Sequence, residues 1–350
     1  MLKVGIIGCG TIAQVRHIPE LANNQNCQLT AYYSATPQKA EKMAERYGGK
    51  AYTDLEEFLS SGLDAVCVCV PNALHAEISV KALNHGLHVL CEKPMATTLE
   101  DCESMVEAAK RNGKKLMIGQ NQRFAQAHVE ARKRIEAGEI GDILSFDTVY
   151  GHAGPEAWSG QKNPWFFDKK RSVFGAMADL GVHKTDLMHY LLGEPIVKVN
   201  ANLCTRDKKY PDGSLISVDD NAFCLYQTAS GVVGSMHVSW TQYGEEINST
   251  VIQGSEGVIR CYTDPKYTLI VEKKHGPVEK LELDTVGVNE EQTSGKFFNS
   301  GVIDAFVDCI LQDKKAPIDG EEALKTMRVI FAAQKSAQTG EAVWIEENKK

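Results

Sequence analysis

Lys3-Val-Gly-Ile-Ile-Gly-Cys-Gly-Thr-Ile-Ala13 joins a short apolar run to a glycine-rich turn near the start of the chain. A β-strand followed directly by Gly-x-Gly-x-x-Ala and then by a helix is typical of the phosphate-binding turn of a dinucleotide-binding fold. Gly8 permits the tight turn, Gly10 lets the backbone approach a pyrophosphate, and Ala13 lets helix and strand pack closely. The N–H groups at the helix start favour an anionic ligand there.

The residues that follow this turn alternate short apolar runs with amphipathic stretches. Such alternation is typical of βαβ units on a parallel sheet, and the continuous apolar run AVCVCV at 65–70 suits a strand covered on both faces. We predict a doubly wound α/β domain over 1–123. Its strands are expected at 3–7, 29–34, 50–52, 65–70, 88–91 and 115–119, and its helices at 13–23, 37–47, 73–85 and 98–112.

The remainder of the chain has a different sequence pattern, in which several strand-like runs are joined by hairpin signals such as Ala229-Ser-Gly231. We predict a second, α+β domain over 124–350, built on a large, mostly antiparallel open sheet. Helices at 297–311 and 320–339 end the chain and are free to pack back on the first domain. Strands are expected at 143–151, 196–205, 222–228, 232–241, 248–253, 258–262, 267–272 and 342–345, with further helices at 125–137 and 176–192.

Composition excludes several classes of protein. Among 350 residues, 38 Lys and Arg stand against 46 Asp and Glu, a net charge of -8 without a basic stripe, which argues against a nucleic-acid partner. No apolar stretch approaches the roughly 18 residues that span a bilayer, and the start lacks a signal peptide. The ten cysteines are scattered without a CxxC pair, so we expect free, buried thiols in a cytoplasmic protein.

The end of the second predicted strand bears on the choice of cofactor. An NAD-binding fold commonly places an acidic residue there for the ribose hydroxyl groups, but this chain has Ser34. Serine does not repel a 2'-phosphate, and Lys39 follows within five residues to supply positive charge. Lys39 can equally be an ordinary solvated helix residue. The sequence therefore permits NAD or NADP, with a slight lean to NADP.

Cys91-Glu92-Lys93-Pro94 lies at the carboxyl end of a predicted parallel strand, where ligands bind in open α/β sheets. The proline holds Lys93 in extended geometry and permits a cis peptide bond, which would fix the direction of the ammonium group. The alternative is an ordinary Lys-Pro loop. The location of Lys93 beside the expected nicotinamide favours a functional role for this lysine.

Asp179 and His183 are four residues apart on the predicted helix 176–192 and are expected to share one face. Histidine suits acid/base catalysis near neutral pH, and a carboxylate one turn away can orient it. Asp186 and His189 extend this polar series. A metal site lacks the spacing of further ligands, so no metal is predicted; a purely structural histidine stays as the alternative.

These motifs together resemble the glucose-fructose oxidoreductase / inositol dehydrogenase / rhizopine-catabolism (Gfo/Idh/MocA) family over essentially the whole chain. The resemblance rests on GIIGCGTIA at the start, VPNALHAE at 70–77, CEKPMATT at 91–98, GQNQRF at 119–124 and FGAMADLGVHKTDLMHYLLG at 174–193. EKP combined with the DxGxHxxD segment is much more specific than the glycine motif.

The resemblance implies a Rossmann domain that binds NAD or NADP and a C-terminal domain whose open sheet forms a homodimer or homotetramer. Lys93, Asp179 and His183 would surround the reacting carbinol and form the catalytic set. The residues implied to contact the cofactor are Gly8, Gly10, Thr11, Ile12, Ser34, Lys39, Pro71, Asn72, His75, Glu92, Lys93 and Gln120. Those implied to contact substrate, besides the catalytic set, are Arg123 and Trp165. His75 can equally be a helix-surface residue.

The predicted function is an NAD(P)-dependent oxidoreductase that transfers a hydride between the nicotinamide and a secondary hydroxyl or keto group. Its substrate would be a sugar, sugar acid, cyclitol or glycoside. One alternative is a glycoside-cleaving enzyme that retains NAD and oxidises C3 transiently to assist elimination. A second is a non-catalytic dinucleotide sensor, against which the intact Lys93, Asp179 and His183 argue.

Overall fold

The computed structural model describes residues 1–283 and 299–345, and its chain divides into two compact units. The first unit contains Met1–Asn121 and Glu291–Leu324, and the second contains Gln122–Glu290 and Lys325–Lys350. The chain therefore contributes to the first unit twice, once from its start and once from a segment that follows most of the second unit.

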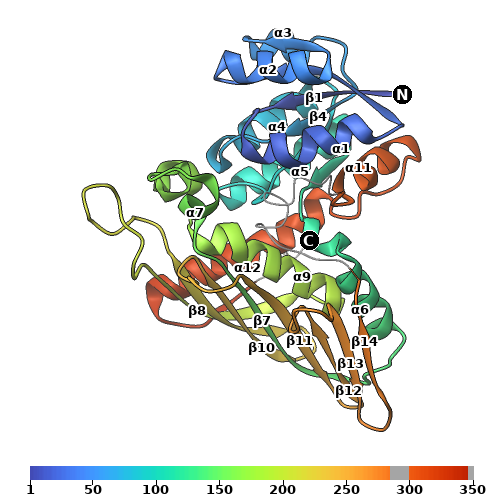
Figure 1. The fold of residues 1–350 in the computed structure, drawn as a ribbon, viewed down its shortest axis with the longest axis vertical. Helices are drawn as coiled ribbons and strands as arrows, with labels where there is room; N and C mark the ends of the chain where they lie inside the picture. Colours follow the sequence, from blue (N-terminus) through green and yellow to red (C-terminus); the bar gives the residue numbers. More distant parts are fainter. Residues whose placement is uncertain (284–298, 346–350) are drawn as a thin grey trace. The chain divides into compact units, whose positions relative to one another are not determined.

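The first unit is built on a six-stranded parallel sheet with the strand order β3-β2-β1-β4-β5-β6 (Figure 1). This order reverses direction at β1, as in doubly wound dinucleotide-binding folds, and confirms the predicted class. All four residues of β4 are buried, as the apolar run predicted. The strands are β1 Leu2–Ile7, β2 Cys27–Tyr33, β3 Lys50–Tyr52, β4 Ala65–Val68, β5 His88–Cys91 and β6 Leu116–Ile118.

Helices connect these strands close to the predicted positions. The helix expected at 98–112 begins after Thr98, whose hydroxyl group accepts a hydrogen bond from the N–H of Asp101, and ends at Gly113 in the left-handed region. The short α3 was not predicted. The helices of this unit are α1 Ile18–Asn23, α2 Pro37–Tyr47, α3 Leu55–Leu59, α4 His75–Asn84 after the 3-10 turn Asn72–Leu74, α5 Leu99–Asn112 and α11 Val302–Leu311.

The first helix differs from the prediction of a plain α-helix over 13–23. It starts as a π-helical turn, Ala13–His17, and continues as α1. Pro19 has no N–H to donate to the preceding turn, so the regular α-helical ladder is interrupted there in any case. π-helical turns occur mostly as single turns within helices, frequently at functional sites.

The returning chain extends the first unit beside β6. The N–H of Ile118 donates to the carbonyl oxygen of Ile318 at 3.0 Å, and Met117 forms an antiparallel bridge with Asp319. Ser300 lies near the start of this returning segment. Its N–H and its hydroxyl group donate hydrogen bonds to the buried Glu20, each at 3.0 Å. The helix predicted over 297–311 is found as α11, and its first two expected residues lie outside the described residues.

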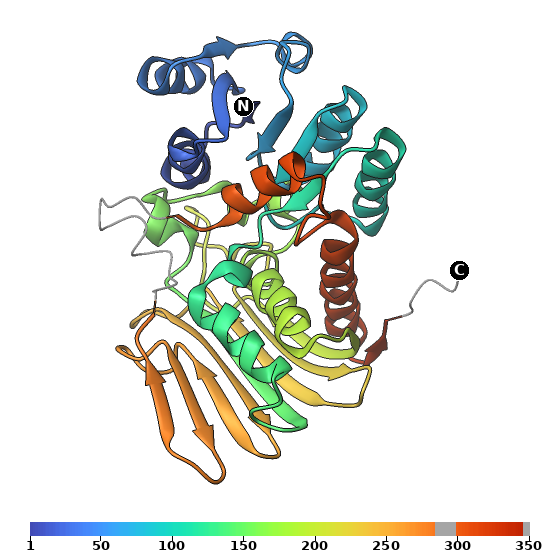
Figure 2. The ribbon, with the colours of Figure 1, turned by 90° about the vertical axis from the view of Figure 1, so that its right-hand side faces the viewer.

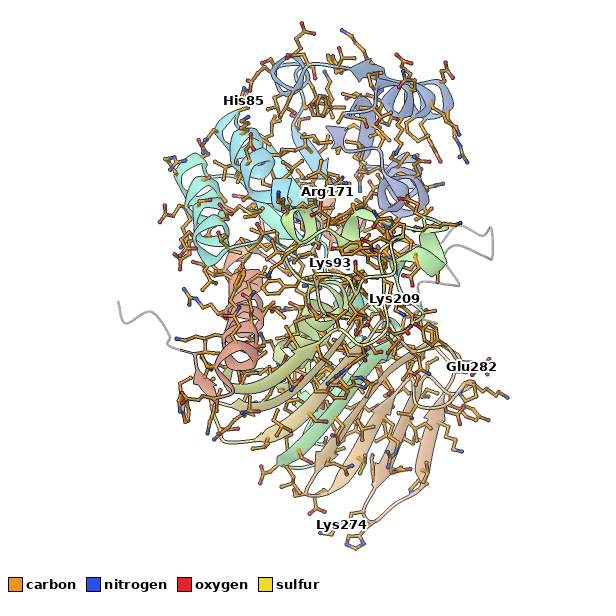
Figure 3. All side chains as sticks on the ribbon, turned by 90° about the vertical axis from the view of Figure 1, so that its left-hand side faces the viewer. His85, Lys93, Arg171, Lys209, Lys274 and Glu282 are labelled. Atoms are coloured by element: carbon orange, nitrogen blue, oxygen red, sulfur yellow. The ribbon has the colours of Figure 1, made fainter. Side chains whose placement is uncertain are left out.

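The second unit is built on a nine-stranded sheet with the order β14-β13-β12-β11-β7-β10-β9-β8-β15. Every neighbouring pair is antiparallel except β7 and β10, which are parallel, as the predicted mostly antiparallel sheet allows. The strand β14 was not predicted; Lys274 lies in the turn that leads to it (Figure 3). The strands are β7 Ile143–Gly151, β8 Ile196–Cys204, β9 Asn221–Thr228, β10 Val233–Ser239, β11 Ile247–Gly254, β12 Gly257–Cys261, β13 Leu269–Lys273, β14 Val278–Leu281 and β15 Val343–Trp344.

Helices cover one face of this sheet, as Figures 1 and 2 show for α6 Gln126–Glu136, α9 Val182–Leu192 and the part of α12 Gly320–Thr339 in this unit. The other face carries no helix among the described residues of this unit. Alternation along β10 explains the difference, because Met236 and Val238 are buried while Val233 is half exposed. We call this helix-free surface the open face. Its apolar members, placed by strand register, are Val149, Phe223, Leu225, Val233, Ile247 and Val251.

Candidate active site

The glycine-rich turn after β1 has the geometry that a pyrophosphate requires. Gly8 has a φ of +96°, and a Cβ atom there would lie 2.4 Å from the carbonyl oxygen of Cys69, so only glycine fits. A Cβ atom at Gly10 would meet no atom within 4 Å, so the backbone there borders open space. Thr11 is exposed, Ile12 is partly exposed and Ala13 is fully buried against the sheet. The turn therefore fits a bound dinucleotide.

Ser34 and Lys39 lie near this turn. Ser34 is buried, and its hydroxyl oxygen accepts a hydrogen bond from the N–H of Thr36 at 3.3 Å. Lys39 is exposed in the first turn of α2. Burial raises the pKa of the Cys9 thiol to about 11, and the nearby Lys39 charge acts in the opposite direction. Since Cys9 lies between Gly8 and Gly10, the Lys39 charge acts at the glycine-rich turn.

His75 joins two strand ends and is not a helix-surface residue, so that alternative is wrong. It is only 1% exposed, with Nδ1 2.7 Å from the carbonyl oxygen of Pro94 and Nε2 2.9 Å from that of Val70. Two carbonyl contacts favour the imidazolium, but burial disfavours it more strongly and lowers the pKa of His75. The ring thus links the end of β4 to the Lys93-Pro94 turn. Asn72, beside it, is also buried.

Glu92 and Lys93 follow β5, and Lys93 is labelled in Figure 3. The Lys93-Pro94 peptide bond is cis. The N–H of Lys93 donates to Oε2 of Glu92 at 3.1 Å, while Oε1 lies 2.6 Å from Nε2 of the buried His17. Burial alone would raise the pKa of Glu92, but the hydrogen bond and the charge of His17 have a larger effect in the opposite direction. The pKa of Glu92 is therefore lowered, to about 2. No local sequence pattern marked His17 as the partner of the EKP motif.

Gln120 follows β6, the last strand of the parallel sheet. Its side chain is 2% exposed, and Oε1 has no hydrogen-bond partner within the described residues. A buried amide oxygen without a donor is costly, so a polar ligand group that donates to it would be stabilised there. Pro71, Lys93 and Gln120 follow the carboxyl ends of β4, β5 and β6, and the carboxyl ends of the strands form the edge at which doubly wound sheets bind ligands.

The second unit contains Asp179 and His183, which are 9% and 7% exposed. Asp179 lies in a π-helical turn, Met177–Gly181, and His183 lies in the first turn of α9, so the plain helix predicted over 176–192 is corrected. The indole N–H of Trp240 donates to Oδ2 of Asp179 at 3.1 Å, and Nε2 of His152 lies 3.8 Å from the same oxygen.

The start of this helical segment is anchored by a buried carboxyl group. Asp219 accepts hydrogen bonds from the N–H groups of Gly175 and Met177 at 2.8 and 2.7 Å. A Cβ atom at Gly175 would lie 1.8 Å from the carbonyl oxygen of Asp219, so a larger residue would displace the anchor. This contact holds the segment from which Asp179 projects.

Arg123 belongs to a polar network with Asp186 and His189 of α9, in which Thr326 lies 3.4 Å from both of the α9 side chains. Arg123 makes a bidentate pair with Asp186, with both N–O distances 2.7 Å, and both side chains are buried. Nε2 of His189 accepts a hydrogen bond from the N–H of Ile196 at 3.2 Å. Asp186 and His189 thus contribute to packing in this unit, and the substrate contact predicted for Arg123 stays a prediction.

An aromatic loop lies between β7 and the Asp179 segment. Trp165 stacks on Phe166 with 4.0 Å between ring centroids, and the guanidinium group of Arg171 lies 5.9 Å from the Trp165 ring. Phe166 lies 6.4 Å from Trp240, which contacts Asp179. A connected series of rings therefore leads from Trp165 to the carboxylate.

Known proteins that resemble this chain point to one family. Residues 2–120 match the oxidoreductase family with an NAD-binding Rossmann fold, and residues 128–260 match the GFO/IDH/MocA C-terminal domain. An uncharacterised oxidoreductase of Streptococcus pneumoniae is 31% identical over 268 residues, 74% of this chain and 68% of that protein. The chain belongs to the Gfo/Idh/MocA family of oxidoreductases.

Other Gfo/Idh/MocA relatives share both units. The levoglucosan dehydrogenase of Pseudarthrobacter phenanthrenivorans is 33% identical over 64% of this chain and 62% of that protein. A levoglucosan dehydrogenase structure with NADH and levoglucosan has a TM-score of 0.86 at 26% identity, covering 99% of this chain and 100% of that one. An aldose-aldose oxidoreductase of Caulobacter crescentus has a TM-score of 0.84 at 28% identity, covering 98% and 99%. The predictions of the family and of an NAD-binding Rossmann fold are confirmed.

The sequence did not single out three side chains around Asp179 and His183 in this Gfo/Idh/MocA protein. They are His152, Trp240 and Tyr150, whose ring lies 6.4 Å from that of His183. Tyr150 and His152 are two residues apart at the end of β7, a spacing that puts both on one side of a strand. Only the pairing of distant segments brings that side against the helix.

In 1–283 and 299–345, no group of three or more His, Cys, Asp or Glu side chains has an arrangement that could hold a metal ion. No helix in those ranges is both long enough and apolar enough to cross a membrane.

Proposed function

We propose that this Gfo/Idh/MocA protein oxidises a secondary hydroxyl group of a sugar, sugar acid, cyclitol or glycoside with NAD(P)+, and catalyses the reverse reduction. The buried Asp179, with His183 four residues later and Trp240 bonded to its carboxylate, is the observation that carries this proposal. Family relatives that include dehydrogenases of levoglucosan support the substrate class.

Each polar group of the proposed site has a defined role in the reaction. The nicotinamide that the strand ends of the first unit would hold would supply the acceptor for the hydride of the reacting carbon. His183 accepts the hydroxyl proton, so that the alcohol loses one hydride and one proton and becomes a ketone. Lys93 stabilises the charge that develops on the oxygen, and Asp179 binds a neighbouring hydroxyl group and orients His183.

The binding of the cofactor is proposed for the strand ends of the first unit. The N–H groups after Gly8 and at Thr11 and Ile12 would hold the pyrophosphate. The unpartnered oxygen of Gln120 is suited to accept a hydrogen bond from the carboxamide group of the nicotinamide. Pro71, Asn72, His75 and Glu92 would line the ribose and nicotinamide side.

We propose a preference for NADP over NAD, because Ser34 adds no negative charge near the adenosine ribose and Lys39 adds a positive one. Ser34→Asp should lower kcat/KM for NADP at least tenfold relative to NAD, since about 1.4 kcal/mol of repulsion already gives that factor. Lys39→Ala should weaken NADP alone. A wild-type enzyme that prefers NAD, or a Ser34→Asp variant with an unchanged ratio, would contradict the assignment.

A panel of sugars, sugar acids and cyclitols, followed by the absorbance of the reduced nicotinamide, tests the activity. His183→Ala and Lys93→Ala should each lower kcat by about 10²- to 10⁴-fold while the protein still folds and binds cofactor. His85→Ala, at the exposed residue that follows α4, and Lys133→Ala, on the surface of α6, are matched controls expected to retain full activity. Product formation from an aryl glycoside without net change of cofactor would indicate the glycoside-cleaving alternative instead.

The open face is the surface through which we propose a homodimer or homotetramer. Phe223, Leu225 and Val233 are 49%, 58% and 49% exposed on adjacent strands, an apolar area that a second copy of the sheet would cover. The ten cysteines are all free, which supports a reducing compartment, and we propose the cytoplasm.

A further inference from the structure

The carboxylate of Asp179 is contacted by two ring N–H groups from separate strand ends of the second unit. Trp240, immediately after β10, donates its indole N–H to Oδ2 at 3.1 Å. His152, immediately after β7, places Nε2 3.8 Å from the same oxygen. Both rings are buried, so the interaction takes place where water screens it little.

The orientation of the His152 ring is determined by its other nitrogen. Nδ1 lies 2.9 Å from the backbone nitrogen of Gly154, whose N–H donates to it. A nitrogen that accepts a hydrogen bond carries no proton, so the neutral ring must hold its proton on Nε2, the atom that faces Asp179. The His152 tautomer is therefore the one that directs an N–H toward the carboxylate.

The loop that provides this N–H is itself held in place. Gly154 has a φ of +94°, a conformation that favours glycine. The ammonium group of Lys208 donates to the carbonyl oxygen of Ala153 at 2.6 Å and pairs with Glu156. A Cβ atom at Gly154 would lie 2.9 Å from Cε of Lys208, so the loop and the lysine pack tightly.

We propose that His152, with its tautomer set by Gly154, and Trp240 are positioning residues that orient Asp179 for the reaction. This inference rests on the proposed function, in which Asp179 binds a substrate hydroxyl group and orients His183. The 3.8 Å between Nε2 of His152 and Oδ2 of Asp179 is longer than a hydrogen bond. At this distance the N–H dipole of His152 is directed at the carboxylate, and we expect the distance to shorten when Asp179 binds a ligand. The side chain of Asp179 then needs little reorganisation during the reaction.

The first experiment examines the contact without relying on activity. The four tryptophan indole N–H signals are observed by ¹⁵N NMR of the full chain, and Trp240→Phe assigns the Trp240 signal. Asp179→Asn should move that signal upfield because the charge-assisted bond is lost. His152→Ala should also move it, by a smaller amount, while His152→Gln should leave it near its wild-type position. An unmoved Trp240 signal in Asp179→Asn would overturn the proposal.

The second experiment measures kinetics on the best substrate of the panel. His152→Ala and Trp240→Phe should each lower kcat by about tenfold, the size expected for residues that orient a reacting group, with the cofactor Kd unchanged. His152→Gln, whose amide can donate in the same direction, should recover most of that loss. Trp344→Phe, at the exposed strand β15, is the matched tryptophan control with unchanged kcat.

The outcomes separate the two proposals. If the wild-type protein oxidises no member of the panel but the indole signals respond as expected, the proposed function fails and the arrangement around Asp179 stands. If turnover is present and His152→Ala lowers only the melting temperature, with kcat unchanged, His152 is structural and this inference is overturned.

Discussion

Lys184, the residue after His183, is buried without a carboxylate to neutralise it among its described contacts. Its ammonium nitrogen lies 3.3 Å from the carbonyl oxygen of Ser249 and 3.4 Å from Oγ1 of Thr250, and 5.8 Å from the ring centroid of Tyr150. Burial lowers the pKa of Lys184 to about 7. A lysine in this environment costs folding free energy whenever it must carry its proton.

The pH dependence of stability should reveal this cost. The unfolded chain holds the Lys184 proton up to about pH 10.4 and the folded chain releases it near 7, so the unfolded state binds more protons between these values. The contribution of Lys184 to the free energy of unfolding therefore rises with pH by up to about 1.4 kcal/mol per unit over that window. In Lys184→Met this rise should vanish and the variant should be more stable at pH 7.

Chemical denaturation from pH 6 to 10 measures the effect. Lys133→Met, at an exposed position of α6, controls for the loss of one positive charge and should leave the pH slope as in the wild type. A Lys184→Met protein that is less stable than the wild type at pH 7 would mean that the ammonium group stabilises the fold.

The pair between Glu92 and His17 behaves in the opposite way. Both side chains are buried, and the partner's hydrogen bond and charge outweigh burial to lower the pKa of Glu92 to about 2. This pair stabilises the protein above the unfolded pKa of about 4.3, and its contribution is lost as pH falls toward 2. Glu92→Gln should lower the free energy of unfolding by about 2 kcal/mol at pH 7 and by much less at pH 3. An equal loss at both pH values, in urea denaturation, would argue against the lowered pKa of Glu92.

At the scale of single elements, the N-terminus of α5 allows a direct test of a cap. Thr98 Oγ1 accepts from the N–H of Asp101 at 3.0 Å. Thr98→Ala should destabilise the protein by about 1 kcal/mol, and Thr98→Ser should retain most of the stability because it keeps the acceptor. Equal midpoints of the three proteins in guanidinium chloride would show that the cap contributes nothing.

Elements with strong local signals were predictable from the sequence, and those defined by distant contacts were not. The buried run at β4 and the Thr98 cap were found close to their predicted bounds because neighbouring residues alone determine them. The short helix α3 and the strand β14 lack such patterns. The parallel pairing of β7 with β10 joins residues far apart in the sequence, such as Ser145 and Val233, which no local periodicity reveals.

The same distinction holds for the candidate site. Gly8, Asp179 and His183 stand out because glycine spacing and helical spacing are local. His152 and Trp240 contact Asp179 only because β7 and β10 end beside the same helix, and His17 meets Glu92 across 75 residues. Side chains brought together by tertiary folding leave no pattern in one sequence.

At the scale of the whole molecule, the open face should determine the assembly state. Leu225 is 58% exposed on β9, one of the strands that form the open face. Leu225→Glu places a charge there and should convert the proposed oligomer to monomers, as measured by light scattering at micromolar concentration. Leu311→Glu, on the equally accessible end of α11, controls for added charge and should leave the mass unchanged. A monomeric wild-type protein would refute the proposed assembly.

The two-part composition of the first unit has a consequence for synthesis on the ribosome. The edge that Ile318 and Asp319 add to β6, and the contact of Ser300 with Glu20, form only after the intervening second unit has been made. A nascent chain that has just emerged through residue 121 therefore lacks part of its own fold. The nucleotide-binding unit, though first in the sequence, is completed almost last, and a chain truncated early should be a target for chaperones and proteases rather than a working binding domain.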